Sequence, residues 1–267
     1  MQRKPLFWLQ LAFTLSVCVF LVVPVVLSAL AGLTVNYQTG LSSGLTFRWV
    51  IEVWSGYRDT IFRSIGISLA CLAVTLVLGI PAAYALAKKQ NGFTRALEEL
   101  LVMPVAVPGL ATALALIVMY GGAGGFRTSW LFILVGHVLF TLPFMVRSVL
   151  AVLLAIDLKT LEEGAASLGA GFIQRFTHIV LPNCRAGIVA GSLMVVTLSM
   201  GEFNMTWLLH TPFTKTLPVG LADAYASLRL EIGSAYTLVF FVMIVPLLIA
   251  MQAVAQKPKQ TFKTDEE

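Results

Sequence analysis

The sequence is poor in charged residues. Only 12% of its 267 residues are Asp, Glu, Lys or Arg, whereas 58% are hydrophobic and the mean hydropathy is +0.88. A soluble domain of this composition would be difficult to keep in solution. A protein that crosses a membrane several times, in contrast, requires such a composition. The scarcity of charge therefore predicts an all-α integral membrane protein.

The sequence also lacks the residue clusters that metal sites, disulfide frameworks and nucleotide-binding loops require. Its three cysteines, Cys18, Cys71 and Cys184, lie far apart, and the three histidines share no ligand spacing with one another or with cysteine. The glycine-rich segment at residues 121–125 has no Gly-Lys-Ser/Thr ending, so it is not a phosphate-binding loop. We therefore expect no metal, no cofactor and no catalytic constellation.

The basic residues do not predict a nucleic-acid surface. The net charge is +5, but Lys and Arg stand in short clusters between apolar runs, which suits the anionic inner leaflet of a membrane. With the N-terminus inside, the inner segments hold eleven of the 18 Lys and Arg residues and the outer segments six, Arg147 being left aside. This bias predicts that both termini lie in the cytoplasm and that nucleic acid is not a partner.

Long apolar runs are what the sequence has instead, and they predict about six transmembrane helices. We expect them at about residues 6–31, 61–87, 100–120, 130–154, 187–209 and 232–255. Aromatic residues gather in residues 34–60, which favours an interfacial loop or a short surface helix. Residues 1–60 are thus expected to hold the first span and an outer segment, residues 61–256 the core, and residues 257–267 a cytoplasmic tail.

The first apolar run has an alternative interpretation as a signal peptide. Ala29-Leu30-Ala31 resembles a cleavage site. The run of roughly 25 residues is long for the apolar part of a signal peptide, however, which favours an uncleaved first span.

Two prolines interrupt the start of the third run. Pro104 and Pro108 each remove a backbone donor, so this end is expected to be bent or partly unwound. Such backbone persists in a membrane only when it is buried in protein or lines a water-filled cavity. Pro104, Pro108 and Gly109 are therefore candidates for the wall of a solute path, with a kink that only aids packing as the alternative.

Two charged residues stand near the ends of apolar runs. Glu202 lies near the outer end of the fifth run, two positions before Asn204. Acidic residues in membrane segments are usually functional or paired, so Glu202 and Asn204 are also assigned to the solute path. Arg147 lies near the inner end of the fourth run and is expected to extend to the interface.

The longest polar interruption of the core, residues 161–182, is expected to form two short helices on the cytoplasmic side. Residues 157–168 favour a helix with a small face, which lets a partner approach the backbone closely. Gly169 then permits a sharp reversal. Apolar residues recur at helical spacing over residues 172–179, which predicts an amphipathic helix that ends at Pro182. Two interpretations remain equal alternatives: a compact pair of helices that docks on a protein partner, and a loop that lies on lipid headgroups.

The spacing of this stretch resembles the EAA loop of the permease subunits of type I ABC importers, the binding-protein-dependent transport family. The matching residues are Glu163, Gly164, Ala165, Gly169, Ile179, Leu181 and Pro182, with Ala166 continuing the small face. The sequence departs from the family pattern at Gly164, where alanine is usual. The resemblance extends from the second span to the sixth.

The resemblance implies a mechanism and its partners. Residues 157–185 would be the coupling element that docks in a groove of a cytoplasmic ABC ATPase dimer, beside a second permease subunit and a periplasmic solute-binding protein. The chain would then lie in the bacterial inner membrane as a non-catalytic subunit. It has no Walker A sequence, which agrees with ATP hydrolysis by a separate subunit. The branch of the family implies a small charged or zwitterionic solute such as aminoethylphosphonate, a polyamine or ferric iron.

Two other classes of protein stay open on the residues alone. A secondary transporter or channel that is not driven by ATP should carry titratable groups at the middle of the membrane, and only Arg147 and Glu202 come near. An integral-membrane enzyme should carry a nucleophile with its base or a metal pair, and no such spacing occurs in the sequence.

Overall fold

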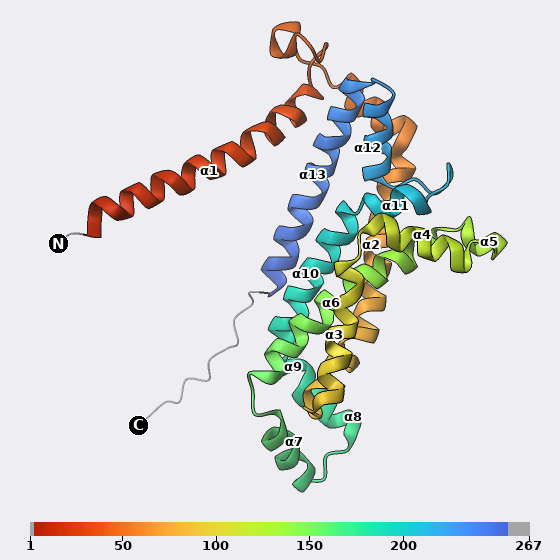
Figure 1. Cartoon of the computed structure of the whole chain (residues 1–267). Coiled ribbons are helices and arrows are strands. Elements are labelled where there is room, and N and C mark those ends of the chain that lie inside the picture. The colour runs from red at the N-terminus through yellow and green to blue at the C-terminus, as the bar shows by residue number, and fades with distance from the viewer. Residues whose placement is uncertain (1–2, 256–267) are drawn as a thin grey trace. The chain divides into compact units, whose positions relative to one another are not determined.

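The computed structural model describes residues 3–255, which are almost wholly helical (Figure 1). The described chain divides into two compact units. The first comprises the chain through Ile61 together with Leu217–Met243, and the second comprises Phe62–Thr216 together with the chain from Ile244 onward. The expected cytoplasmic tail, residues 257–267, lies outside the described residues.

Five helical elements contribute to the first unit. They are α1 (Arg3–Ala31), the short 3-10 helix Gly40–Ser43, the start of α2 (Arg48–Lys88), α12 (Leu217–Ala226) and the start of α13 (Leu230–Ala255). The second unit contains the remaining parts of α2 and α13 together with all the other helices. These are α3 (Gly92–Ala106), α4 (Gly109–Tyr120), α5 (Gly124–Arg127), α6 (Trp130–Leu154), α7 (Leu158–Ser167), α8 (Phe172–Arg175), a π-helical turn (Phe176–Val180), α9 (Leu181–Asn183), α10 (Arg185–Gly201) and α11 (Asn204–Leu209).

Four of these helices are long and apolar enough to cross a membrane. They are α1, α2, α6 and α13. Two further spans are possible if each bent pair counts as one: α3 with α4, bent by 100°, and the helical stretch Phe172–Asn183 with α10, bent by 70°. This confirms the all-α membrane fold predicted from composition.

The segment expected to be an interfacial loop or a short surface helix is partly helical. A short bridge joins Thr34 to Leu45, but residues 48–60 belong to α2, which continues without a break into the apolar run. No proline separates the two parts, and the Trp49 indole N–H donates to the Thr34 carbonyl oxygen at 2.9 Å. The segment between the fifth and sixth apolar runs likewise contains a helix, α12, whose first turn accommodates Pro218.

The third run begins earlier than the sequence predicted, and it bends by 100° within the segment where the two prolines predicted a bend. Asn91 starts α3 by accepting from the Thr94 backbone N–H at 2.9 Å, while the Thr94 hydroxyl accepts from the Asn91 N–H at 3.0 Å. Pro104 lies inside α3. The chain breaks at Val107, because the following Pro108 forces it into an extended conformation with ψ of 132°.

The fifth run is also divided. It was expected to continue to residue 209, but α10 ends at Gly201 and α11 begins at Asn204. Glu202 is extended, with ψ of 117°, and Phe203 precedes α11. Two helix breaks, at residues 107–108 and 202–203, therefore interrupt the second unit.

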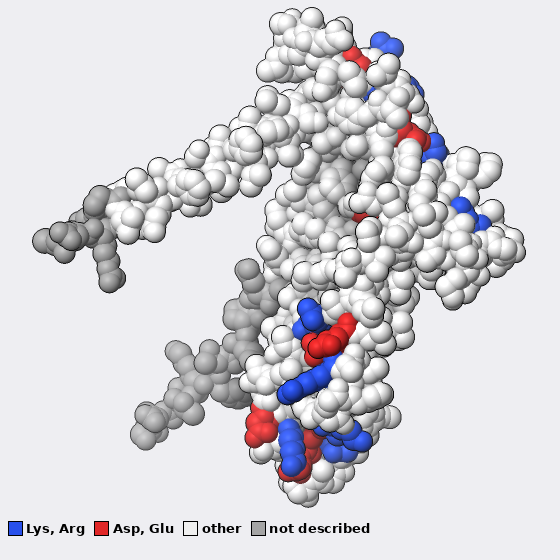
Figure 2. All heavy atoms as spheres, in the orientation of Figure 1, with Lys and Arg blue, Asp and Glu red and all other residues white. Residues whose placement is uncertain are grey.

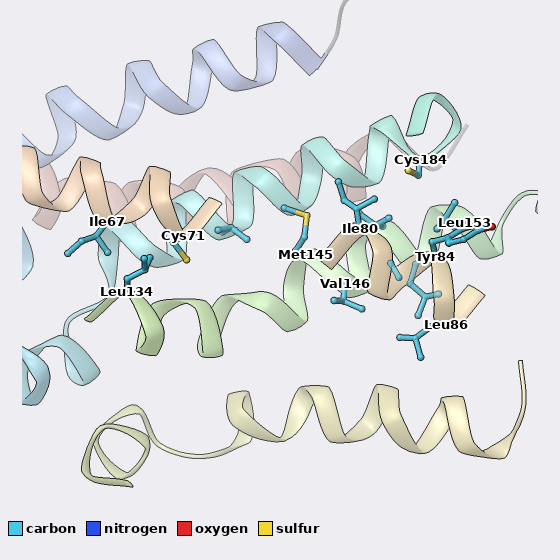
Figure 3. Close-up of a cluster of buried hydrophobic side chains, with 14 of the residues drawn as sticks. Ile67, Cys71, Ile80, Tyr84, Leu86, Leu134, Met145, Val146, Leu153 and Cys184 are labelled. Atoms are coloured by element: carbon cyan, nitrogen blue, oxygen red, sulfur yellow. The ribbon is translucent and has the colours of Figure 1, made fainter. Parts of the chain in front are cut away.

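The core of the second unit lies among α2, α6 and α10. Figure 3 shows buried side chains of this cluster, including Cys71 of α2 and Met145 of α6. Close approach of α6 and α10 depends on glycine. A Cβ atom on Gly187 would lie 2.5 Å from the backbone oxygen of Ser148, and Gly191 follows four residues later. This is the small-residue spacing that lets two membrane helices touch along their backbones.

Candidate functional site

The polar stretch after α6 folds into α7 and a second helical segment, and we call residues 158–183 the α7–α9 segment. Asp157 begins α7 by accepting from the Thr160 N–H at 3.3 Å. Hydrogen bonds from Thr160 hold the pKa of the exposed Asp157 carboxyl below its usual value. The helix predicted for residues 157–168 is thus present with a side-chain cap at its start.

Gly169 makes the reversal that ends α7. Its φ is +83°, in the left-handed region that favours glycine. The Gly169 N–H donates to the Ala166 oxygen at 2.9 Å, and the Ala170 N–H donates to the Ala165 oxygen at 3.0 Å. These two bonds form a Schellman motif, which satisfies carbonyls that the end of the helix would leave unpaired.

Glu162, which the sequence reasoning did not assign to the site, attaches α7 to the end of α2. Its side chain is buried, accepts from the Tyr84 hydroxyl at 2.5 Å and lies 3.3 Å from the Lys88 ammonium. Glu163 instead points outward, with 67% of its side chain exposed, and lies 3.8 Å from Lys159. Leu158 is buried one turn before Glu162, so these two residues lie on the same face of α7. An acidic residue on this apolar face was the sequence signal that could have identified Glu162.

The second helical segment continues past the residue where it was expected to end. Pro182 has no N–H, and one residue earlier the Leu181 N–H donates to the Phe176 oxygen, five positions back. The Asn183 side chain donates to the Ile179 oxygen at 2.8 Å. The helix therefore accommodates Pro182 through a π-helical turn, and it bends only after Asn183.

Exposed apolar side chains accompany charge on the α7–α9 segment. Leu168 is 89% exposed, Ile173 75% and Leu161 43%. Figure 2 shows acidic and basic side chains gathered over the end of the second unit that carries α7 and α8. Gly164 and Ala166 are exposed as well, so the small face predicted for α7 is open to a partner.

A cavity of about 270 Å³ that is lined by several charged residues lies beside α7. Its lining includes Lys88, Lys159 and Arg175 together with both glutamates of α7. The buried Nε atom of Arg175 has no hydrogen-bond partner among the described residues. The cavity thus places three basic residues beside the two glutamates of α7.

The residues assigned to a solute path fall into two groups. Pro104 lines an almost wholly apolar cavity of about 450 Å³ among α2, α3 and α6. Pro108 and Gly109 start α4 instead, where a Cβ atom on Gly109 would lie 3.5 Å from the Asn204 Cβ atom and 3.7 Å from Glu202 Oε1. The structure thus brings Gly109, Glu202 and Asn204 together at the two helix breaks, and Pro104 lines a different space.

The Glu202 carboxylate is turned into the protein. Only 9% of its side chain is exposed. It accepts from the backbone N–H groups of Met205 and Thr206 and from the Thr206 hydroxyl, each at 2.9 Å. The carboxylate therefore caps the first turn of α11.

His137 and Ser199 extend this polar cluster. His137 lies in α6 and is 1% exposed, with Nδ1 2.8 Å from the Ser199 hydroxyl and Nε2 2.8 Å from the Thr206 hydroxyl. The sequence reasoning missed this cluster because it sought metal-ligand spacing. A histidine inside an apolar run that must find hydrogen-bond partners was the available signal.

Arg147 has a carboxylate neighbour as well as access to the surface. Its Nε atom lies 4.0 Å from Glu98 of α3, and 56% of its side chain is exposed. Such an exposed and loose ion pair contributes little to stability. Among residues 3–255, no group of three or more His, Cys, Asp or Glu side chains could hold a metal ion.

Residues 76–260 match the family described as the binding-protein-dependent transport system inner membrane component. The chain belongs to this family. The permease spans about nine tenths of the length of two relatives, PhnV and PotI. PhnV of Salmonella paratyphi A, whose name assigns it to 2-aminoethylphosphonate transport, is 25% identical over 90% of this chain and 91% of its own.

Other relatives carry different solutes in their names. The putrescine transport system permease protein PotI of Escherichia coli K12 is 27% identical over 91% of the permease and 90% of its own length. A bacterial ABC transporter involved in the import of alginate shares the fold, with a TM-score of 0.72 at 16% identity over 97% of both chains. The permease is thus a multi-pass membrane subunit of an ABC importer, and its relatives do not agree on a solute.

Proposed function

We propose that this permease is driven by a separate cytoplasmic ATPase that docks on its α7–α9 segment. The observation that carries this proposal is the exposure of Leu168 and Ile173 at the charged end of the second unit. Exposed apolar surface that is rimmed by polar residues is typical of a protein-binding site. Lys88, Lys159 and Arg175 line a cavity on the same segment and offer basic groups to a partner.

The segment has two mechanical connections to the spans. The buried contacts of Glu162 with Tyr84 and Lys88 connect α7 to the end of α2. The rings of Phe176 and Tyr84 pack edge to face with centroids 5.5 Å apart, and the same segment leads through the 70° bend into α10. A partner that pulls on the segment would therefore move α2 and α10 together.

The proposed assembly lies in the bacterial inner membrane with both termini in the cytoplasm. It contains an ATPase dimer that hydrolyses ATP, a second permease subunit and a periplasmic binding protein that delivers the solute. The solute is a small charged or zwitterionic molecule. The names of the phosphonate and putrescine permeases support this class, and Asn204 beside Gly109 is our candidate for a path-lining side chain.

A charge placed on the segment tests the coupling. Ile173→Asp should abolish binding of the ATPase to the purified permease, because a carboxylate would be buried against an apolar groove. Gln90→Asp, in the exposed turn between α2 and α3, adds the same charge outside the segment and is the matched control. Equal ATPase binding by wild type and Ile173→Asp would overturn the proposal and favour a loop that lies on headgroups.

A further inference from the structure

α11 is held at both of its ends by charged side chains. Glu202 accepts from the N–H groups of its first turn, and the Arg127 guanidinium donates to the Leu209 carbonyl oxygen at 2.9 Å and to the Leu208 oxygen at 3.4 Å. An anion at the start of a helix and a cation at its end both complement the helix dipole. A helix of six residues is too short to be stable alone, so these contacts decide where it lies.

The middle of α11 is held by a hydrogen-bond chain whose direction can be derived. The Thr206 hydroxyl has one proton, which it donates to Glu202, so it must accept from the Nε2–H group of His137. The His137 Nδ1 atom of a neutral ring then accepts from the Ser199 hydroxyl. One tautomer of His137 thus connects α6, α10 and α11.

α11 packs closely against α6 at Gly136. A Cβ atom on Gly136 would lie 2.5 Å from the Met205 sulfur and 2.8 Å from a Leu209 methyl group. Met205, Thr206 and Leu209 are buried, whereas Asn204 and Trp207 are exposed. The polar contacts therefore hold one face of α11 against α6 and present the other face outward.

We propose that Glu202, His137 and Arg127 are positioning residues that clamp α11, and that Glu202 does not bind the solute. The carboxylate has its hydrogen bonds satisfied by α11 and is nearly buried, which is unlike a group that must receive a solute. The clamp keeps Asn204 beside Gly109 at the meeting point of the two helix breaks. That this point lies on the solute path rests on the proposed function, whereas the clamp does not.

Labelling of a buried residue of α11 tests the clamp in the full-length permease in lipid nanodiscs, without ATP or an ATPase. Met205→Cys, in a Cys18→Ser background that removes the exposed native thiol, should react slowly with a water-soluble maleimide. Adding Glu202→Gln or Thr206→Val should raise the labelling rate at position 205 at least about tenfold, which corresponds to ~1.4 kcal/mol in the opening equilibrium. Thr206→Ser, which keeps the hydroxyl, should leave the rate low.

A second buried position separates a local clamp from general stability. Val195→Cys in α10 is as buried as position 205, and its labelling should stay within about twofold of its starting rate in every variant. The proposal is overturned if position 205 does not respond, if positions 195 and 205 rise together, or if Thr206→Ser behaves as Thr206→Val does. It is also overturned if Glu202→Gln changes which solutes compete for uptake while labelling stays slow. Failure of ATPase coupling would leave the labelling result unchanged.

Discussion

Two glycines in the second unit show how differently two of its regions are built. Gly187 lies in the seam between α6 and α10, where a Cβ atom would meet backbone at 2.5 Å. Gly169 lies in the α7–α9 segment, where a Cβ atom would meet nothing within 4 Å but φ is +83°. The seam needs glycine for closeness, and the segment needs it for backbone conformation. The seam is closely packed within the protein, whereas the segment is exposed to a partner.

The difference extends to the side chains around each glycine. Val149 and Met145 of the seam are fully buried, while Leu168 and Ile173 of the segment are largely exposed. The seam therefore contributes more to the stability of the fold, whereas the segment mainly contributes exposed surface. Elements that bind partners and move are commonly drawn from the less stable parts of a fold.

The largest expected effect is at the seam. Gly187→Ala should destabilise the permease by about 1–3 kcal/mol or more, because the added methyl group clashes with the Ser148 backbone, which cannot move aside easily. Gly66→Ala in α2 is the control, since nothing lies within 4 Å of its Cβ position. Thermal unfolding in detergent measures both. A Gly187→Ala protein as stable as Gly66→Ala would contradict close backbone packing.

The next effect is at the attachment of α7 to α2. Tyr84→Phe removes a hydrogen bond to the buried Glu162 carboxylate, a contact worth roughly 1.5–3 kcal/mol when the acceptor is charged. It should lower the thermal stability and the transport per ATP hydrolysed in the assembled importer. Glu163→Gln, which alters an exposed carboxylate, should leave thermal stability unchanged. The attachment would be disproved if both variants unfolded at the wild-type temperature.

A smaller effect is expected at the reversal. Gly169→Ala places a side chain in the left-handed region, at a cost of roughly 1–2 kcal/mol. The strain can relax locally because the surroundings are open, so we expect weaker ATPase stimulation with little loss of global stability. ATP hydrolysis by the assembled importer measures this. Unchanged stimulation would show that the reversal is not required for coupling.

The smallest effect should be favourable. Gly164 lies inside α7 with nothing within 4 Å of its Cβ position, so Gly164→Ala should stabilise the helix by up to about 1 kcal/mol. Hydrogen exchange of the α7 amides measures the gain. Faster exchange in Gly164→Ala would contradict the expectation that the added methyl group stabilises α7.

Much of the helical framework followed from the apolar runs. The run at residues 130–154 has the same limits as α6, and the run at residues 232–255 begins two residues inside α13. Runs of this kind end where the chain leaves the apolar environment, so composition locates them. The start of α2 could not be located in this way, because residues 48–60 are helical without being uniformly apolar.

The sequence could signal that Glu162 and His137 are buried, but the distant residues that they contact could not be predicted. Glu162 and Glu163 are adjacent in sequence, and only packing against Tyr84, 78 residues away, buries one and exposes the other. The partners of His137 lie 62 and 69 residues along the chain. Gly169 was predictable, because a reversal after a helix demands a particular backbone conformation at one position.

The central claim is that the α7–α9 segment carries the contact with the ATPase. The most direct measurement is cysteine crosslinking of Leu168→Cys, in a Cys18→Ser background, to a cysteine in the groove of the ATPase subunit. We predict a crosslink at position 168 whose yield changes when ATP is added, and none from Gln90→Cys, an exposed position outside the segment. Absence of a crosslink at position 168 in an importer that still transports would contradict the claim.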